Sequence, residues 1–195
     1  MDNPFLRSVL IRPPVVLGQQ MLPFSAYHMA ALMLIDSPYA PTAPQPKVSR
    51  QDLAVAAFVC AHGFEDGPGL MFPDLNEDEF CKFCDPDADF EYENAQFQTY
   101  ITDYCTVPEI WTPVDTSATK TTGIPVPFHL VGVVLQAFSG ITRAEAWNMG
   151  IGELIGYKVS VAEENGADVK SQRDYELLEF KRQIEAQAKA NNGTA

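Results

Sequence analysis

The chain has 195 residues, of which 46% are hydrophobic, and this length and composition predict one folded domain with a packed core. A formal net charge of −13 argues against nucleic acid as a direct partner, since phosphate contacts need a surface rich in lysine and arginine. No run of 18 apolar residues is present, and arginines and prolines interrupt the first 24 residues, so we expect neither a membrane span nor a signal peptide. These features predict an intracellular protein with no membrane partner and with reduced cysteines.

The N-terminal part alternates short apolar runs with proline and then enters a helix. Residues 1–24 are predicted to form extended segments or a small hairpin. Ser25 is a suitable N-cap for a helix over residues 26–35. This helix should end before Pro38, because proline disfavours the helical conformation in the residue before it. The three prolines within residues 39–47 then indicate a surface loop.

A second helix is predicted to begin after Ser49. Asp52 stands three residues later and offers the reciprocal partner of a capping pair. Gly63 is expected to close this helix. The residues expected on its buried stripe are Leu53, Ala56, Ala57 and Cys60.

An acidic, loop-rich insertion is predicted over residues 65–122. Between Glu65 and Asp115, fourteen acidic residues stand against one basic residue, Lys82. Aromatic and aliphatic residues recur at helical spacing within it, so we expect one amphipathic helix there. Those residues are Phe97, Tyr100, Ile101 and Tyr104.

Residues 123–166 carry the clearest helix signals of the chain. A helix is predicted after Pro125, and Gly140 is expected to end it in the left-handed conformation that glycine adopts without steric cost. The predicted buried stripe of this helix is Phe128, Val131, Val134, Leu135 and Phe138.

Two further helices should follow at once. Thr142 and Glu145 form a capping box at the start of the first. Asn148 is predicted to cap the second, which should end near Gly166. We expect Trp147 to be buried at the junction between the late helices. The predicted stripe of the last helix is Ile151, Leu154, Ile155, Val159 and Ala162.

Residues 167–195 are predicted to form a C-terminal helix with a frayed end. A narrow apolar seam suits docking to a core or to a partner. The seam consists of Leu177, Phe180, Ile184 and Ala188. The whole pattern predicts a mainly α fold and a single domain over residues 1–195, and it leaves a homo-oligomer open.

The four cysteines are candidate ligands of a zinc site. Cys81 and Cys84 have a spacing that can hold zinc. Cys60, His62 and Cys105 could complete the ligand set, but they lack a matching short spacing. We therefore predict two packed thiols, no stoichiometric zinc and no cofactor.

The segment from Asp85 to Glu91 is similar to the start of a calcium-binding loop. Such a loop needs glycine at its sixth position and a bidentate glutamate at its twelfth. Phe90 and Gln96 occupy these positions. We therefore predict a solvated acidic face in place of a calcium site.

No catalytic constellation is predicted. His28, His62 and His129 are scattered over separate segments, and no serine or cysteine stands in a recognisable nucleophile motif, so structural roles are expected for the histidines. The segment 138–147 has the short glycine turn of a helix-turn-helix, but Arg143 is its single cation, which argues against DNA reading.

Three segments carry a family resemblance. SAYHMAALMLIDSPYA and SRQDLAVAAFVCAHGF, followed by ITRAEAWNMGIGELIGYKVSVAEENG, resemble small proteins encoded in the tail modules of tailed phages and prophages, described as tail assembly chaperone-like proteins. The most specific piece is EAWNM, from Glu145 to Met149, leading into a helix and then Tyr157. Gly150 follows the methionine, where the family often has proline. The acidic insertion has no counterpart in the family pattern.

The resemblance implies a mainly helical, non-enzymatic protein of the host cytoplasm. Such chaperones hold the aggregation-prone tape measure protein while tail tube subunits assemble around it. The alternatives are a virion structural protein of the neck or head–tail connector and, from another class, a metal-dependent enzyme. Methionine offers adaptable apolar surface to an irregular partner. The candidate partner-binding or structural residues are Trp147, Met149, Tyr157, Met29 and Met33.

Overall fold

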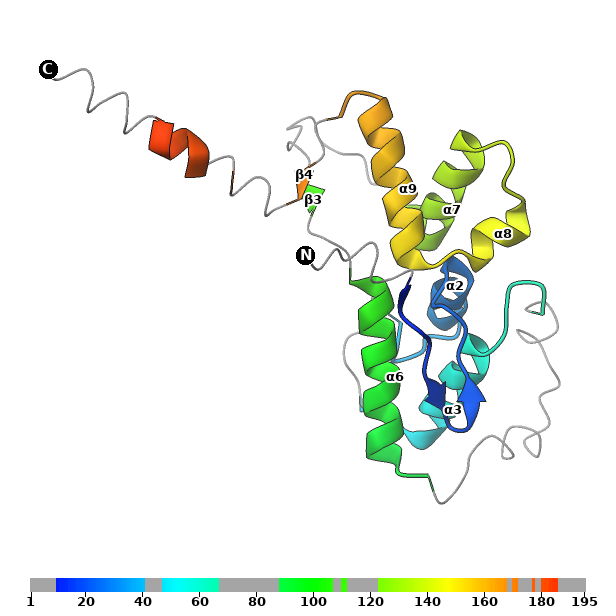
Figure 1. Cartoon of the computed structure of the whole chain (residues 1–195). Coiled ribbons are helices and arrows are strands. Elements are labelled where there is room, and N and C mark those ends of the chain that lie inside the picture. Colours follow the sequence, from blue (N-terminus) through cyan, green and yellow to red (C-terminus); the bar gives the residue numbers. More distant parts are fainter. Residues whose placement is uncertain are drawn as a thin grey trace, which may run out of the picture. The chain divides into compact units, whose positions relative to one another are not determined.

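The computed structural model describes a mainly helical fold with a short N-terminal hairpin, as the sequence predicts (Figure 1). The described residues are 10–40, 47–66, 88–106, 110–111, 123–167, 170–171, 177 and 180–185. The chain divides into two compact units, which are Met1–Val107 with Thr122–Lys158, and Pro108–Thr121 with Val159–Ala195. Among the described helices, none is both long and apolar enough to cross a membrane.

The hairpin pairs β1 (Val15–Val16) with β2 (Gln19–Gln20) in antiparallel register. Its two turn residues, Leu17 and Gly18, have φ angles of 49° and 76°. Positive φ at both central positions is the turn that matches the twist of paired strands, although it is costly for leucine. The carboxylate of Glu93 accepts the Leu17 N–H at 2.8 Å and so holds this turn.

The first two long helices begin as predicted. In α2 (Ala26–Leu34) Ser25 is the N-cap and His28 returns the second bond of a capping box. In α3 (Arg50–Cys60) Ser49 and Asp52 form the same arrangement. Each box pairs backbone N–H groups that a helix start leaves without an intrahelical partner; the sequence predicted the cap residue of both helices and the capping pair of α3.

Helix α6 (Phe90–Cys105) confirms the amphipathic helix predicted within the acidic stretch. Its buried residues are Phe97, Tyr100 and Tyr104. The Tyr100 hydroxyl donates to the Leu22 carbonyl at 2.7 Å, and the Tyr104 hydroxyl donates to the Ile11 carbonyl at 2.8 Å. This part of the acidic stretch therefore belongs to the core and anchors the N-terminal segment.

Helices α7 (Val126–Ala137), α8 (Arg143–Asn148) and α9 (Ile151–Glu164) form the predicted late helices. Helices α7 and α8 pack against α2 and against each other (Figure 1). The buried residues that this group contributes to the core are Leu130, Val131, Val134, Ala146, Trp147, Ile151 and Leu154.

The end of α7 differs from the prediction. Gly140 does not take the left-handed conformation, and the helix ends at Ala137. Phe138 leaves the helix with φ −123° and ψ 100°, and its ring packs edge-on against Tyr157 at a centroid distance of 5.1 Å. Helix α7 therefore ends at an aromatic contact with α9 and not at a glycine cap.

Phe128 is the second departure in α7, because it is 51% exposed although it was placed on the buried stripe. The buried face runs through Pro127, Leu130, Val131 and Val134. Successive residues turn by about 100° around a helix, so Phe128 falls at the edge of this face.

The second unit contains a short strand pair and the end of α9. Strand β3 (Ile110–Trp111) pairs antiparallel with β4 (Lys170–Ser171). Gly166 has φ 84° and the Ala167 N–H donates to the Ala162 carbonyl at 2.9 Å, which is the glycine-capped end predicted for α9. The seam residues described in the C-terminal segment, Leu177, Phe180 and Ile184, are 50–60% exposed, whereas Ala188 lies outside the described residues.

Candidate functional site

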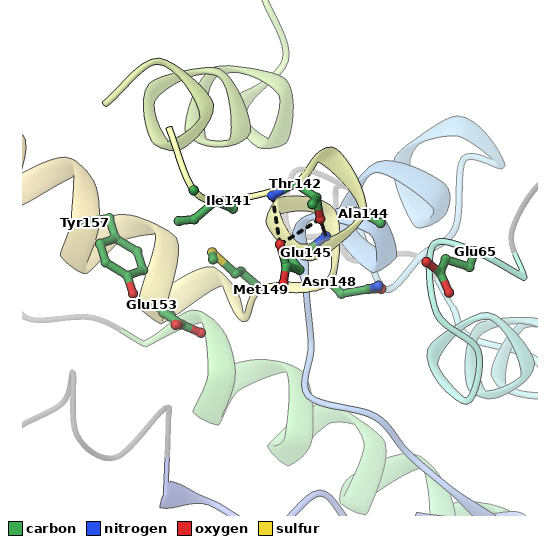
Figure 2. A pocket seen from close by; sticks show the side chains of 10 residues that line it. Glu65, Ile141, Thr142, Ala144, Glu145, Asn148, Met149, Glu153 and Tyr157 are labelled. Atoms are coloured by element: carbon green, nitrogen blue, oxygen red, sulfur yellow. Dashed lines mark hydrogen bonds between the residues drawn. The ribbon is translucent and has the colours of Figure 1, made fainter. Parts of the chain in front are cut away.

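An open hollow of about 690 Å³ lies where α8 meets α9 (Figure 2). Its apolar lining comes from Ile141, Ala144, Met149 and the ring of Tyr157. Its carboxylates are Glu65, Glu145 and Glu153. A mixed surface of this kind offers an apolar floor and an anionic rim to a ligand.

The capping box of α8 fixes one wall of the hollow. The Glu145 N–H donates to Thr142 Oγ1 at 3.2 Å. Glu145 Oε2 in turn accepts the Thr142 N–H at 2.8 Å and the Thr142 hydroxyl at 2.7 Å. These bonds, the backbone one first, lower the pKa of Glu145, so its carboxylate is ionised at neutral pH.

The link between α8 and α9 is pinned to the start of α2. The Ala26 N–H donates to the Met149 carbonyl at 3.2 Å, and the Ile151 N–H donates to the Phe24 carbonyl at 3.0 Å. An isolated antiparallel bridge at Gly150 lies between these two bonds. The backbone beneath the hollow is therefore held by the buried core.

Asn148 does not cap α9, contrary to the prediction. Its Oδ1 accepts the backbone N–H of Phe64 at 2.8 Å, so it joins α8 to the loop after α3. A Cβ at Gly63 would lie 3.2 Å from that oxygen, which favours glycine at this close approach. The bond brings Glu65, on the same loop, to the rim of the hollow.

Trp147 is 6% exposed, which confirms its predicted burial. Its ring stacks on Phe64 at 5.8 Å with an interplanar angle of 7°, and Phe128 meets it edge-on at 4.9 Å. Offset and edge-to-face pairs of this kind add to the free energy gained by burial. Trp147 therefore fixes α8 against the loop after α3 and against α7.

The other candidate partner-binding residues divide between the hollow and the core. Met149 and Tyr157 both line the hollow. Met29 is buried in α2 at 7% exposure, and Met33 is partly buried against the same core. Met149 and Tyr157 are therefore together at one surface, whereas Met29 and Met33 belong to the core around α2.

His28 has the structural role that the sequence predicts. Its Nδ1 accepts the Ser25 N–H at 3.1 Å, so the proton of the neutral ring lies on Nε2, which donates to the His62 carbonyl at 2.8 Å. Burial lowers the pKa of His28 to about 4. His62 also has a backbone partner, because its Nδ1 lies 2.8 Å from the Phe58 carbonyl.

In the described part of the chain, no group of three or more His, Cys, Asp or Glu residues is arranged to hold a metal ion. Burial raises the pKa of the Cys105 thiol to about 12 and that of Cys60 well above its usual range. Cys81 and Cys84 lie outside the described residues. Asp89, from the calcium-like segment, instead caps α6 by accepting the backbone N–H groups of its first turn.

Compared with known proteins, the chain matches no family model, no curated protein and no solved structure.

Sequence reasoning did not single out three of the residues in the hollow. Glu153 could have been found, because it stands four residues before Tyr157 and so shares a face of α9 with it. Glu65 and Ile141 had no such signal, since each reaches the hollow from a loop whose position depends on tertiary contacts.

Proposed function

We propose that this protein is a non-enzymatic tail assembly chaperone of a tailed phage. It binds the tape measure protein in the host cytoplasm, with tail tube subunits as a second partner. The family resemblance of the segments around α2, α3 and α8–α9 supports this proposal, and the observation that carries it is the exposure of three large apolar side chains at the start of α7. Its residues, Ile124, Val126 and Phe128, are 54%, 53% and 51% exposed.

Helix α7 has a composition that suits an apolar partner. None of its twelve residues is charged, in a chain with 20% charged residues. A helix that faces water usually carries charges on its outer side. Exposed apolar surface without charges is typical of a site that receives the apolar face of another helix.

Co-expression with the tape measure protein encoded beside this chain tests the proposal. A soluble complex that elutes together on size exclusion is expected, and Val126→Ser should reduce the amount recovered. Leu34→Ser is the matched control, because Leu34 is 63% exposed on another helix. The proposal fails if the client is equally insoluble with and without this chain and no complex elutes.

The neck or head–tail connector alternative makes a different prediction for purified phage particles. A chaperone is expected to be absent from the finished particle, whereas a connector subunit is expected in it at fixed stoichiometry. Quantitative mass spectrometry of purified particles separates the two.

A further inference from the structure

We infer that the α8–α9 hollow receives a lysine or arginine side chain projecting from a helical segment of the protein's partner. The inference rests on the proposed function for the identity of that partner. It assigns the hollow a distinct task, which is to recognise a cation at the edge of an apolar helix.

Charge complementarity is the first support. Glu65, Glu145 and Glu153 line the hollow, and none of the described residues that line it is a lysine, arginine or histidine. Glu145 is held in the ionised form by the two bonds from Thr142. A cation beside the half-buried Glu153 gains Coulomb attraction from that carboxylate, and the exposed Glu65 and Glu145 add to the negative potential of the hollow.

The floor of the hollow selects a side chain with an apolar stem. Ile141 and Met149 lie beside the Tyr157 ring, and Glu153 stands next to that ring on α9 (Figure 2). Lysine and arginine bury their methylene stems along apolar surface while the charged group reaches polar partners. An aromatic ring adds attraction for a cation over its face.

The walls are already in place before any partner binds. The Tyr157 ring is packed by Phe138 at a centroid distance of 5.1 Å, the Met149 carbonyl is bonded to Ala26, and Asn148 is bonded to Phe64. A preformed surface loses little conformational freedom on binding, so more of the contact energy appears as affinity.

The geometry favours a cation carried on a larger body over a free metal ion. The described carboxylates are not gathered into a group of three that could hold a metal. The hollow is also open to solvent, as expected for a surface that a protruding side chain enters from a docked helix.

Two labelled synthetic peptides provide the test, an amphipathic helix with arginines bordering its apolar face and the same helix with glutamine at those positions. Fluorescence anisotropy should show that Glu153→Gln weakens the arginine peptide up to about fivefold, the range expected for one partly exposed ion pair. Glu163→Gln on the exposed end of α9 is the matched control and should leave binding unchanged. The glutamine peptide should bind wild type and Glu153→Gln equally weakly.

Equal weakening of arginine-peptide binding by Glu153→Gln and Glu163→Gln would overturn the inference, because the attraction would then come from the overall negative charge. Unchanged binding in both variants would also overturn it. So would equal binding of the two peptides by wild type. A normal thermal midpoint for Glu153→Gln excludes misfolding. If the peptide test fails but the tape measure protein still co-purifies, the proposed function is kept and the inference about the hollow is rejected. If the arginine peptide binds selectively but the tape measure protein remains insoluble, the inference about the hollow is kept and the proposed function is rejected.

Discussion

Helices α2 and α8 begin with the same local device in opposite surroundings. The box at α2 uses Ser25 and His28, each 1% exposed. The box at α8 uses Thr142 and Glu145 on the protein surface. The two starts use the same hydrogen-bond arrangement, but burial gives them different energetic consequences.

The buried capping box makes hydrogen bonds at the start of α2 and beyond the end of α3, whereas the exposed capping box makes hydrogen bonds only at the start of its own helix. The ring of His28 accepts a bond at the start of α2 and donates one to the His62 carbonyl beyond α3. Glu145 bonds Thr142 within α8. The position of α8 therefore depends on another side chain, Trp147, which packs between two aromatic rings.

Trp147→Ala should have the largest effect, with a loss of about 3–5 kcal/mol of unfolding free energy, because it leaves a cavity among packed aromatic rings. A urea titration followed by circular dichroism measures it. Phe180→Ala is the control and should change little, since Phe180 is 60% exposed. A loss below about 1 kcal/mol for Trp147→Ala would mean that α8 is held in another way.

The buried box should make stability depend on pH. Burial lowers the pKa of His28 from 6.5 to about 4 in the folded protein, so the unfolded chain takes up a proton first as pH falls. His28 therefore stabilises the fold above pH 6.5, and this contribution is lost as pH falls towards 4. At about 1.4 kcal/mol per pKa unit, the loss is on the order of 2 kcal/mol by pH 5 and 3 kcal/mol by pH 4.

Denaturation series between pH 7 and pH 5 test this dependence by comparing wild type with His28→Gln, which should have a flatter profile. His129→Gln is the control, because His129 is an exposed histidine on α7. A wild-type profile that runs parallel to that of His28→Gln would show that protonation of His28 does not destabilise the fold.

The sequence predicted helix boundaries that depend on neighbouring residues and missed those that depend on tertiary contacts. The starts at Ser25, Ser49 and Thr142 are decided by partners within three residues, so local reading found them. The end of α7 and the partner of Asn148 depend on rings and loops distant in sequence, and both were predicted wrongly.

The candidate site shows the same division. Met149 and Tyr157 belong to the segment that carries the family resemblance, and both line the hollow. Glu65 reaches the hollow from the loop after α3. The hydrogen bond that holds this loop to α8 joins Phe64 to Asn148, which are 84 residues apart in sequence. Apolar periodicity and cap residues describe one helix at a time. They therefore cannot predict a surface that is formed by a loop and two helices.

A direct comparison of the two caps should give a smaller effect. Ser25→Ala should cost about 2 kcal/mol and Thr142→Ala about 1 kcal/mol, because loss of a buried cap leaves a backbone N–H away from water. Thermal unfolding of both variants at pH 7 measures the difference. Equal losses at the two positions would show that burial does not separate the boxes.

Gly132→Ala should have the smallest effect and the opposite sign. Gly132 lies inside α7, which packs against both α2 and α8, and a Cβ there would meet no atom within 4 Å. Alanine should therefore stabilise the protein by about 0.5–1 kcal/mol through its higher helix propensity. Because the substitution does not touch His28, the gain should be the same at pH 7 and pH 5. Gly18→Ala is the contrasting variant: its φ of 76° strains any side chain, so it should destabilise the hairpin. A loss of stability in Gly132→Ala would contradict the open space at that position, and a gain confined to one pH would show that α7 is coupled to the buried histidine.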